Sequence, residues 1–560
     1  MPHPTQNAFR PTLGALALFA LLPHAALAAR CADTVDPHSP VLSNGFGFNS
    51  ANTRVQPSQI TSGNVGDLQL AYTHVAEGAK EKRGAPAVTQ QTVYFSEKNE
   101  IVAANRITGC EYWRFKGLVK FSLIGNNAMR SSAVVYLPPS GNKPAMVFAG
   151  DFFGNMYGIN AQTGKQMWRA QMGGPETDRH FITGSPQIHN GTMFVPVSTK
   201  EVVTTVLHVL EACCKSHGLL QAVDPYTGKI KWTYHTATST AYYPATGTRG
   251  PNGMSIWGVP AIDVDNNAVV IGTGQNLSPP TTGNSNAIIS LDMATGKVRW
   301  VFQSTPNDVF NASCLAPDAL ADRCKSPGPD FDFGAPPIVA ALPFGGKAII
   351  AGAKNGVVYS LNPRTGAVNW QQRIGAGGNL GGVHWGMAVD GRRIYAGVTD
   401  LSVNKITSIA LTDLADPYAL VGKNIQIVAD ASPGVYALDL LSGRVLWQRR
   451  FTHVTAGQPH PSLYSAALTV TNDVLLAGSM DGELKALRTT DGQELWSYQT
   501  AVPVTGVNGA KGQGGSIDNA GPVVAGGDVL INSGYMFSGG QTAYTAGPGN
   551  ALFVFRLPAR

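Results

Sequence analysis

The sequence predicts an all-β protein, and more specifically a β-propeller of eight blades. Three observations carry this prediction. A short pattern that ends in tryptophan recurs along the chain, runs rich in Val, Ile and Tyr alternate with turns rich in Gly, Asn and Asp, and no Pro/Ser-rich linker divides the chain. A chain of 560 residues would ordinarily be expected to hold several domains. A repeat that continues through most of it favours one large body instead.

The first residues of the chain resemble a secretory signal. Arg10 precedes an apolar run from Leu13 to Leu22, and small residues follow at positions 26–28. The apolar run is much shorter than the ~20 residues that a membrane-spanning helix requires. We therefore expect residues 1–29 to be removed, and residues 30–560 to form a single domain that is periplasmic or secreted and has no membrane span.

The repeated unit places a tryptophan four positions after a glycine. Seven of the nine tryptophans obey this rule, in "ITGCEYW", "QTGKQMW", "YTGKIKW", "ATGKVRW", "RTGAVNW", "LSGRVLW" and "TDGQELW". In each unit a strand leads into a tight turn, where Gly can take positive φ, and a second strand carries the Trp. Two further strands lie upstream. Four antiparallel strands per unit form a propeller blade, and the Trp can fill the gap to the next blade.

An eighth blade has to be assembled from both ends of the chain. After Trp496 the sequence still holds "AGPVVAGGDVLINSGY" and "NALFVFRLP", while "LQLAYTHV" near the N-terminus stands where a Trp-bearing outer strand would precede the first blade. We expect this N-terminal strand to pair with the C-terminal blade and close the ring, which leaves no sheet edge exposed. A seven-bladed ring is the alternative.

Six cysteines in an exported chain are compatible with disulfides. Cys213–Cys214 and Cys314–Cys324 are close enough to pair, which leaves Cys31 with Cys110, although spacing alone does not fix the connectivity. A bridge between neighbours closes almost no chain, so chain entropy gives little reason for Cys213–Cys214. The formal net charge of +6 is dispersed without a Lys/Arg cluster, which gives nucleic-acid binding little support.

The Trp repeat resembles that of the quinoprotein alcohol dehydrogenases, which bind pyrroloquinoline quinone (PQQ) at the hub of an eight-bladed propeller. Within this family the most similar subgroup is the polyvinyl alcohol dehydrogenases. The adjacent cysteines carry this similarity, together with the segments "FITGSPQIHNG", "GPNGMSIWGVPAID", "GPDFDFGAPPIV" and "GGNLGGVHWGMAVDG". The resemblance implies a PQQ- and calcium-dependent enzyme that oxidises secondary alcohols to ketones. Polyvinyl alcohol is a candidate substrate. The chain has no Cys-x-x-Cys-His and so no covalent c-type haem, which implies a separate electron acceptor such as cytochrome c.

The resemblance also implies a catalytic base in "PDFDFGAPP". Asp330 aligns with the family's base, and the resemblance implies that it is a metal ligand as well. Asp332 aligns with a second acid that only some members have, and Asp308 is a further alternative. An additional carboxylate suits a larger trivalent ion, so Asp332 leaves a lanthanide open beside calcium.

Two further metal ligands are implied by neighbouring blades. Glu201 follows a strand end where the family has a calcium ligand, with Glu211 as the alternative. The family's Asn after Gly-Thr-Gly is replaced by Gln275, and Asn276 follows it. The amide oxygen of either is a hard ligand suited to calcium, and the choice between them stays open.

The cofactor would lie between Trp257, which is outside the repeat, and a lid formed by the Cys213–Cys214 disulfide. His217 stands where an Arg is typical and is either a pH-dependent contact to a PQQ carboxylate or a plain surface His. The remaining cofactor contacts expected from the resemblance are Lys354, Thr183, Arg130 and Trp385. Arg130 is alternatively an interblade salt bridge, and His384 with Trp385 would form the wall of the substrate mouth.

Two other functions compete with this one. A non-catalytic propeller of the outer-membrane assembly-factor type shares the Trp repeat but has no use for adjacent cysteines or an acid pair. A PQQ-dependent sugar or polyol dehydrogenase would share the cofactor site. The chain has no Gly-rich phosphate loop that leads into a helix, which argues against NAD or FAD.

Overall fold

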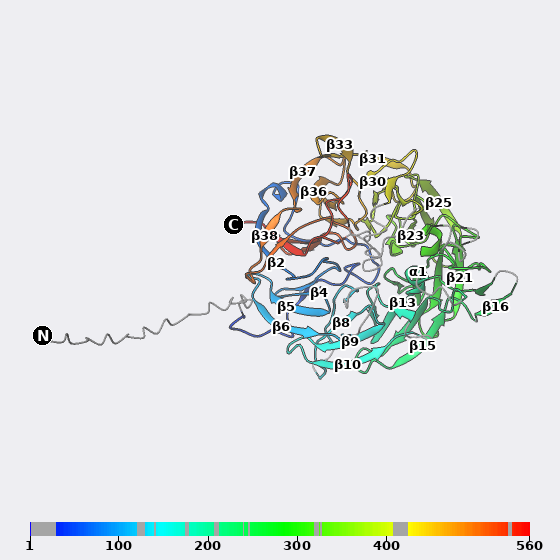
Figure 1. The fold of residues 1–560 in the computed structure, drawn as a ribbon, viewed down its shortest axis with the longest axis horizontal. Coiled ribbons are helices and arrows are strands. Elements are labelled where there is room, and N and C mark those ends of the chain that lie inside the picture. The colour runs from blue at the N-terminus through cyan, green and yellow to red at the C-terminus, as the bar shows by residue number, and fades with distance from the viewer. Residues whose placement is uncertain are drawn as a thin grey trace.

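Eight β-sheets stand around a central hub, and Figure 1 views the ring along its axis. This computed structural model describes residues 1, 30–119, 129–138, 142–173, 179–205, 212–238, 240–244, 247–317, 324, 327–406, 424–535 and 540–559. The prediction of an eight-bladed propeller is confirmed. The expected signal segment, residues 1–29, lies almost wholly outside the described residues.

Each blade is an antiparallel sheet whose first strand lies nearest the hub. The eighth blade takes its outer strand from the N-terminal part of the chain. Blades one to four consist of β1 (Val41–Ser43), β3 (Ala87–Thr89), β4 (Thr92–Glu97), β5 (Glu100–Asn105) and β6 (Glu111–Lys116); β7 (Val134–Tyr136), β8 (Met146–Gly150), β9 (Asn155–Asn160) and β10 (Gln166–Gln171); β11 (His180–Phe181), β12 (Gln187–His189), β13 (Thr192–Thr199), β14 (Leu219–Val223) and β15 (Ile230–His235); and β18 (Ala261–Asp263), β19 (Ala268–Gly272), β20 (Ala287–Asp292) and β21 (Val298–Gln303). Blades five to eight consist of β22 (Ile338–Ala341), β23 (Lys347–Gly352), β24 (Val357–Leu361) and β25 (Val368–Arg373); β26 (Met387–Val389), β27 (Arg393–Val398), β30 (Gly434–Asp439) and β31 (Val445–Arg449); β34 (Thr469–Thr471), β35 (Val474–Gly478), β36 (Glu483–Arg488) and β37 (Glu494–Gln499); and β40 (Val523–Ala525), β41 (Asp528–Ser533), β42 (Ala551–Arg556) and β2 (Gln69–Val75).

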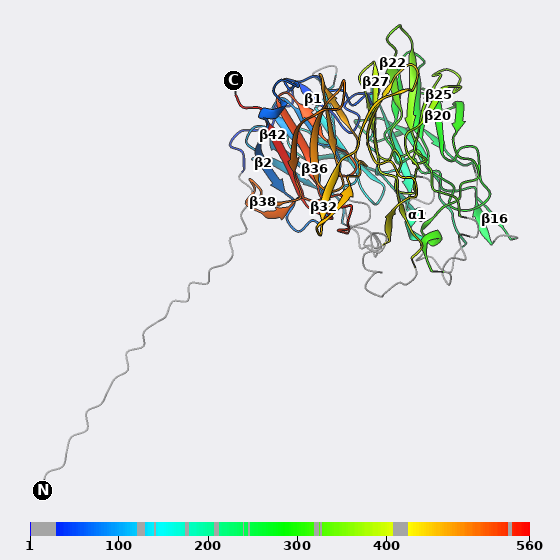
Figure 2. The same cartoon turned by 90° about the horizontal axis from the view of Figure 1, so that it is seen from above.

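Short hairpins and helical turns decorate the blades. They are β16 (Ala241–Tyr243) with β17 (Thr248–Gly250), β28 (Leu401–Val403) with β29 (Ile425–Ile427), β32 (Thr452–Thr455) with β33 (Gln458–Pro461), β38 (Pro503–Thr505) with β39 (Lys511–Gln513), and the helical turns η1 (Val65–Asp67), α1 (Glu201–Thr204) and η3 (Ala312–Leu315). In Figure 2, α1, β16, β32 and β38 lie toward one end of the ring and β1 toward the other. We call the end that carries α1 the mouth end.

The repeated tryptophans join each blade to the next. Six indole N–H groups donate to a backbone carbonyl of the following blade: Trp113 to Ala161 (2.9 Å), Trp168 to Pro225 (2.9 Å), Trp232 to Met293 (3.3 Å), Trp300 to Pro363 (2.9 Å), Trp370 to Leu440 (3.3 Å) and Trp447 to Thr489 (3.0 Å). The indole packs on the Gly of that blade's own repeat. A Cβ at Gly366, which has φ +73°, would lie only 2.6 Å from the ring of Trp300. The glycine therefore serves its own turn and also receives the preceding blade's tryptophan.

The joint that closes the ring is built differently. β2 pairs antiparallel with β42, from Gln69 opposite Arg556 to Val75 opposite Ala551, as expected from the sequence. Tyr72 of β2 replaces the tryptophan, since its hydroxyl donates to Arg106 O at 3.1 Å and its ring packs where a Cβ on Gly109 would fall.

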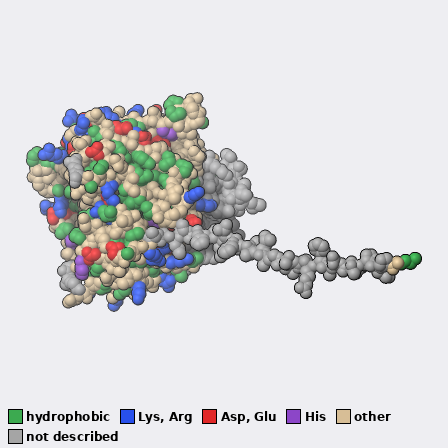
Figure 3. All heavy atoms as spheres, turned by 90° about the vertical axis from the view of Figure 1, so that its left-hand side faces the viewer, with side chains coloured by type: hydrophobic (Ala, Val, Ile, Leu, Met, Phe, Trp, Pro, Cys, Tyr) green, Lys and Arg blue, Asp and Glu red, His purple; other side chains and the backbone are tan. Residues whose placement is uncertain are grey.

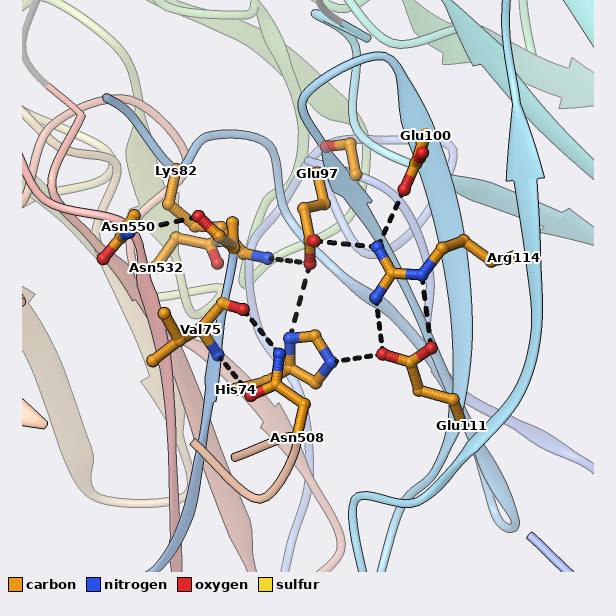
Figure 4. A network of polar contacts seen from close by, with 12 residues as sticks. His74, Val75, Lys82, Glu97, Glu100, Glu111, Arg114, Asn508, Asn532 and Asn550 are labelled. Atoms are coloured by element: carbon orange, nitrogen blue, oxygen red, sulfur yellow. Dashed lines mark hydrogen bonds and ion pairs between the residues drawn. The ribbon is translucent and has the colours of Figure 1, made fainter. Parts of the chain in front are cut away.

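Buried ion pairs add to this joint, and Figure 4 shows the network. His74 of β2 lies 2.9 Å from Glu111 and 3.4 Å from Glu97. Glu97 also pairs with Lys82 at 3.5 Å and with Arg114 at 2.8 Å. All of these except Arg114 are buried, so the closing joint carries charge where the other joints carry a neutral indole.

An irregular segment, residues 44–56, crosses the hub at the end opposite the mouth; we call it the hub strap. Its backbone carbonyls accept hydrogen bonds from blades four to seven: Ser50 from Ile262 (2.7 Å), Ala51 from Val339 (3.0 Å), Thr53 from Val389 (2.9 Å) and Arg54 from Val470 (3.0 Å). The side chain of Arg54 is 1% exposed and donates to Leu468 O at 2.6 Å and Pro522 O at 3.1 Å. The strap thus ties most of the blades together from one side.

The core is divided into layers, one between each pair of neighbouring blades, as in the cluster that joins Val270 and Ile288 to Val339 and Ile349. On the face shown in Figure 3, Lys and Arg side chains are spread among acidic ones. Within the described residues, no helix has the length and apolar character needed to cross a bilayer.

Candidate active site

A cavity with about 1100 Å³ of empty space, including its open entrance, lies at the mouth end of the hub. Its polar side chains come mainly from segments that precede the innermost strands: Arg130, Thr183, Asp330, Asp332 and His384, joined by Gln275 and Lys354. Its apolar side chains come mainly from α1, η3 and nearby loops: Phe181, Val202, Val203, Leu277, Phe310, Ala312, Leu315, Leu380 and Val403. Trp257, Trp385 and Tyr535 add aromatic rings to the hub side.

Asp330 is the centre of a short chain of buried polar contacts. One of its oxygens lies 3.1 Å from the Lys354 ammonium group, which is also 2.8 Å from Asp332. The other oxygen of Asp332 accepts a hydrogen bond of 2.8 Å from the indole N–H of Trp257. Oδ1 of Asp330 has no hydrogen-bond partner among the described residues, although it is buried. The structure therefore brings together the three side chains that the sequence assigned to base, second acid and stacking ring.

The charges in this cluster shift one another. Burial raises the pKa of Asp330, and the carboxylates of Asp332 and Asp308 raise it further, against the opposing effect of Lys354. Burial alone would lower the pKa of Lys354, but Asp330 and Asp332 outweigh it and raise that pKa. The pKa of His384 is lowered well below 6.5 by burial and by the Lys354 charge. A carboxylate of raised basicity with one free oxygen is suited to accept a proton.

Asp308, the further alternative for the base, lies behind Asp330 and not on the cavity. It is fully buried and accepts the backbone N–H groups of Asp330 (3.1 Å) and Phe331 (2.8 Å) and the amide of Asn286 (2.7 Å). Asp330 has a φ of +61°, which is uncommon for a residue other than Gly. Asp308 thus holds the backbone of Asp330 in a strained conformation, as is often found at functional sites.

The two adjacent amides, Gln275 and Asn276, differ in their surroundings. Gln275 lines the cavity, donates from Nε2 to Phe310 O at 3.1 Å, and accepts no hydrogen bond on its oxygen from a described residue. Asn276 is fully buried, donates to Asn252 O at 2.9 Å and accepts the N–H of Thr282 at 3.1 Å. Only the Gln275 oxygen is therefore available to the cavity.

Glu201, expected to ligate the metal, begins α1 but is not among the cavity-lining residues. Its carboxylate lies 3.0 Å from Arg179 and accepts the backbone N–H groups of Lys215 (2.9 Å) and Ser216 (2.6 Å) and the Ser216 hydroxyl. Both of its oxygens are taken by these donors. The alternative, Glu211, lies outside the described residues.

The three disulfides expected from the sequence, Cys31–Cys110, Cys213–Cys214 and Cys314–Cys324, are all present. Cys213 and Cys214 pack with Leu277 and Val202, both of which line the cavity, and are almost fully buried themselves. The adjacent-cysteine disulfide thus backs the apolar wall and is not itself a lining residue.

His217 does not reach the cavity. Its Nε2 lies 2.9 Å from Nδ1 of His235, and burial together with the charges of His235 and His180 lowers its pKa to about 4. A neutral His217 makes no ionic contact to a carboxylate near neutral pH. Thr183, Arg130 and Trp385 do line the cavity, and the Trp385 indole N–H has no partner among the described residues.

A relay of hydrogen bonds behind His384 was not foreseen from the sequence. Ser465 donates its hydroxyl hydrogen to Asp518 at 2.6 Å, so it accepts at 2.8 Å from Nδ1 of His384. This fixes the tautomer and leaves Nε2 of His384 as an acceptor. Ser465 and Asp518 follow His384 by 81 and 134 positions, and no motif marks them; only their equivalent places at the start of later blades could have pointed to them.

The side chains present fit PQQ and, in part, a divalent cation. A flat, acidic quinone suits a cavity lined by the indoles of Trp257 and Trp385 and by two cations (Arg130 and Lys354), with the Trp385 N–H unpartnered among the described residues. The unpartnered oxygens of Asp330 and Gln275 are hard ligands of the kind that calcium takes. No group of three His, Cys, Asp or Glu in the described ranges could hold a metal without other ligands.

Comparisons with known proteins identify the family of the chain. The family profile described as "Glucose/ethanol/alcohol dehydrogenase, beta-propeller domain" matches residues 46–374. The polyvinylalcohol dehydrogenase of a Pseudomonas species is 32% identical over 94% of this chain and 78% of its own length. The chain belongs to the PQQ-dependent alcohol dehydrogenase family. A second member, the polyvinylalcohol dehydrogenase of Sphingopyxis sp. (strain 113P3), is 29% identical over 92% of this chain and 76% of its own.

Two solved structures share the fold, and a second family profile matches part of the chain. The quinohemoprotein alcohol dehydrogenase of Comamonas testosteroni superposes with a TM-score of 0.66 at 19% identity, over 93% of this chain and 81% of its own. ADHIIG of Pseudomonas putida HK5 gives 0.68 at 18%, over 94% and 81%. A profile for the outer membrane protein assembly factor BamB matches residues 354–550. That match begins at Lys354, within the fifth blade, and therefore does not include Asp330.

Proposed function

We propose that the protein is an exported PQQ- and calcium-dependent dehydrogenase that oxidises secondary alcohols with an aliphatic chain, polyvinyl alcohol among them, to ketones. The observation that carries this proposal is Asp330. One oxygen of this buried carboxyl group is held by Lys354, and the other faces no partner among the described residues. A binding scaffold would have no reason to bury a carboxylate in this way, at a cost of at least ~1–3 kcal/mol for the unpaired group.

The residues of the cavity divide the chemistry among them. Asp330 takes the proton of the alcohol hydroxyl, and Lys354 keeps its carboxyl group in place. Bound PQQ would supply the acceptor for the hydrogen and the two electrons removed from the alcohol carbon. Trp257, whose N–H is fixed on Asp332, presents a flat ring for stacking, and Arg130 supplies a cation for a cofactor carboxylate.

A divalent cation would be held by Asp330 and the Gln275 oxygen. Asp332 is not needed as a ligand, because its two oxygens are engaged by Lys354 and Trp257. This favours calcium over a lanthanide, which would use an additional carboxylate. Glu201 in its present contacts has no oxygen to offer.

The cavity wall supports an aliphatic substrate. Val202, Leu277, Leu315, Leu380 and Val403 give the cavity a large apolar surface. An aldose would have to leave several hydroxyl groups unpaired against such a wall, which is unfavourable for each of them. An alkyl chain with one hydroxyl directed at Asp330 has no such penalty, so a sugar dehydrogenase is the less supported alternative.

Export is supported by three disulfides and by the signal-like residues 1–29. We place the mature enzyme in the periplasm or outside the cell, with residues 30–560 as one domain. Electrons pass from the cofactor to an acceptor such as cytochrome c.

Dye reduction by the mature protein tests this proposal, with PQQ and calcium added singly and together, on secondary alcohols, polyvinyl alcohol and an aldose. Reduction should require both additions, and Asp330→Asn should lower kcat by about 10²–10⁴-fold, the range for loss of a general base. Quenching of tryptophan fluorescence by PQQ should persist in this variant. Asp265→Asn, at an acid 67% exposed on a β-turn, is the matched control. Absence of saturable PQQ quenching, or an Asp330→Asn enzyme with wild-type rate, would overturn the proposal.

A further inference from the structure

A second cavity lies beside the hub cavity, between the first blade and the segment that follows β2. It encloses about 940 Å³ of empty space, including its open side. The residues that line it are Gly78, Ala79, Lys80, Glu81, Arg83, Ser96, Lys98, Asn99, Lys116, Val119 and Met129. We call it the lysine cavity.

Three of its positive charges are not neutralised. Lys80, Lys98 and Lys116 are exposed, come from three separate segments, and form no ion pair with any described residue. The one acid of the lining, Glu81, is paired with Arg83.

The two acids of the first blade that lie beside this lining are already used by the closing joint of the ring. Glu97 is engaged by Lys82, His74 and Arg114, and Glu100 by Arg114 at 2.8 Å, as Figure 4 shows. Rotating Glu97 toward the lysines would leave the buried Lys82 without its acid, which is strongly unfavourable. Rotating Glu100 away from Arg114 would neutralise only one of the three lysines. The lysine cavity therefore keeps a net positive lining whatever the rotamers of its neighbours.

The lysine cavity and the hub cavity share a wall. Arg83 lines the former, and its guanidinium lies 4.2 Å from the ring centroid of Tyr535, which lines the latter. Consecutive residues, Met129 and Arg130, line one cavity each. A partner seated on the lysines would thus lie one layer of side chains away from the hub cavity.

We propose that the lysine cavity is the docking site of an acidic protein that carries one electron at a time. This inference rests on the proposed function. Oxidation of a secondary alcohol to a ketone releases two electrons and two protons, so two oxidised carriers are each reduced by one electron per alcohol, and the protons pass to water. The site is suited to transient docking, since the ammonium groups of its three lysines are exposed on long side chains.

The experiment compares two triple variants with the same change of charge. Lys80→Gln, Lys98→Gln and Lys116→Gln remove the lysine-cavity charges, while Lys165→Gln, Lys229→Gln and Lys297→Gln remove three exposed lysines from equivalent turns of other blades. Succinylated cytochrome c, which is acidic, serves as the carrier, and unmodified, basic cytochrome c as the counter-probe. Each rate is divided by the rate with an uncharged dye, which reports on the hub alone.

At low ionic strength, the rate of acidic cytochrome reduction divided by the dye rate should be about tenfold lower for the first triple variant than for the wild type. This is the lower end of the effects that electrostatic steering produces. The difference should vanish near ~0.5 M salt, where the screening length is only a few ångströms. The control variant should behave as wild type. Calorimetric titration of the acidic cytochrome into the full-length mature protein without PQQ should show the same loss of affinity.

Equal losses in both triple variants, or equal reduction of acidic and basic cytochromes, would overturn the docking site. Failure of the wild type to reduce the dye would instead overturn the proposed function. In that case the calorimetric titration still decides whether the lysines bind an acidic partner.

Discussion

The Trp-docked joints and the joint that closes the ring solve the same packing problem with different chemistry. At a docked joint such as Trp300 on Gly366, a neutral indole donates one hydrogen bond and fills a space that a glycine leaves open. At the closing joint, Tyr72 takes that place and buried ion pairs around His74 and Glu97 are added.

The difference reflects how far apart in the sequence the joined strands lie. A docked joint connects neighbours in the sequence, whereas the closing joint pairs Gln69 with Arg556 across almost the whole mature chain. Such a non-local pairing carries a loop-closure cost, and nothing in the local sequence fixes its register. We infer that the ion network specifies this one register, because a slipped β2 would move His74 away from both Glu111 and Glu97 and leave buried charges unpaired.

The largest effect is expected from Glu97→Ala. The change leaves Lys82, whose side chain is fully buried, without its acid, and removing one partner of a buried ion pair costs about 3–5 kcal/mol. The midpoint of urea unfolding, followed by tryptophan fluorescence, should fall accordingly. Asp265→Ala at the exposed pair with Lys347 should cost only about 0–1 kcal/mol. Equal shifts for the two variants would contradict a special role for the closing joint.

An intermediate effect is expected from acidification. Burial alone would raise the pKa of Glu111, but hydrogen bonds and charges from His74 and Arg114 outweigh it and lower the pKa from 4.5 to about 2. A lowered pKa gives stability that is present above pH 4.5 and lost as the pH falls toward 2. The pKa of His74 is lowered from 6.5, chiefly by burial, so protonation of the unfolded chain also weakens the joint below pH 6.5.

Thermal midpoints recorded between pH 7 and pH 2 check this prediction. The wild-type midpoint should fall with pH, and a His74→Gln, Glu111→Gln double variant should show a shallower slope. Trp300→Phe, at an uncharged joint, should keep the wild-type slope. A double variant with the unchanged slope would place the pH dependence elsewhere in the molecule.

The smallest effects are expected where only a hydrogen bond is removed. Trp300→Phe loses the bond to Pro363 O and Tyr72→Phe the bond to Arg106 O, each worth about 1 kcal/mol net. Tyr72→Phe should be the milder of the two, because it deletes one oxygen and leaves the ring in place, while Trp300→Phe also shrinks the ring. Urea midpoints of the two variants, measured side by side, test the order. A larger loss for Tyr72→Phe would mean that its hydroxyl also orders the neighbouring ion pairs.

Much of the fold could be predicted because the repeat encodes both halves of each docked joint, the tryptophan and the glycine that receives it. The closing strand was predictable from "LQLAYTHV", but its charged partners were not, since Glu97 and Glu111 lie on other strands and resemble solvent-exposed acids in the sequence. The hub strap was missed because residues 44–56 have no periodic pattern, and their hydrogen bonds go mostly to backbone groups, which any sequence offers.

In the candidate site, too, some residues could be predicted from the sequence and others could not. Asp330, Trp257, Lys354 and Gln275 were predicted by resemblance to family motifs, and all four line one cavity. The surroundings of Glu201 could not be predicted, because its donors are supplied by Lys215 and Ser216, which the disulfide turn brings back toward α1.

The hub strap has a consequence for a polymeric substrate. Because residues 44–56 seal the far end, with Phe46 packed against the cluster that contains Trp385, the ring is a cup and not a tube. A long chain cannot be threaded through it and reeled out on the other side. A hydroxyl in mid-chain can reach Asp330 only as the tip of a bend, and the resulting ketone has to leave by the way it came. Successive oxidations along one chain would then be set by how easily that chain folds back on itself, so stiff or crystalline polymer should be oxidised more slowly than the same polymer in solution.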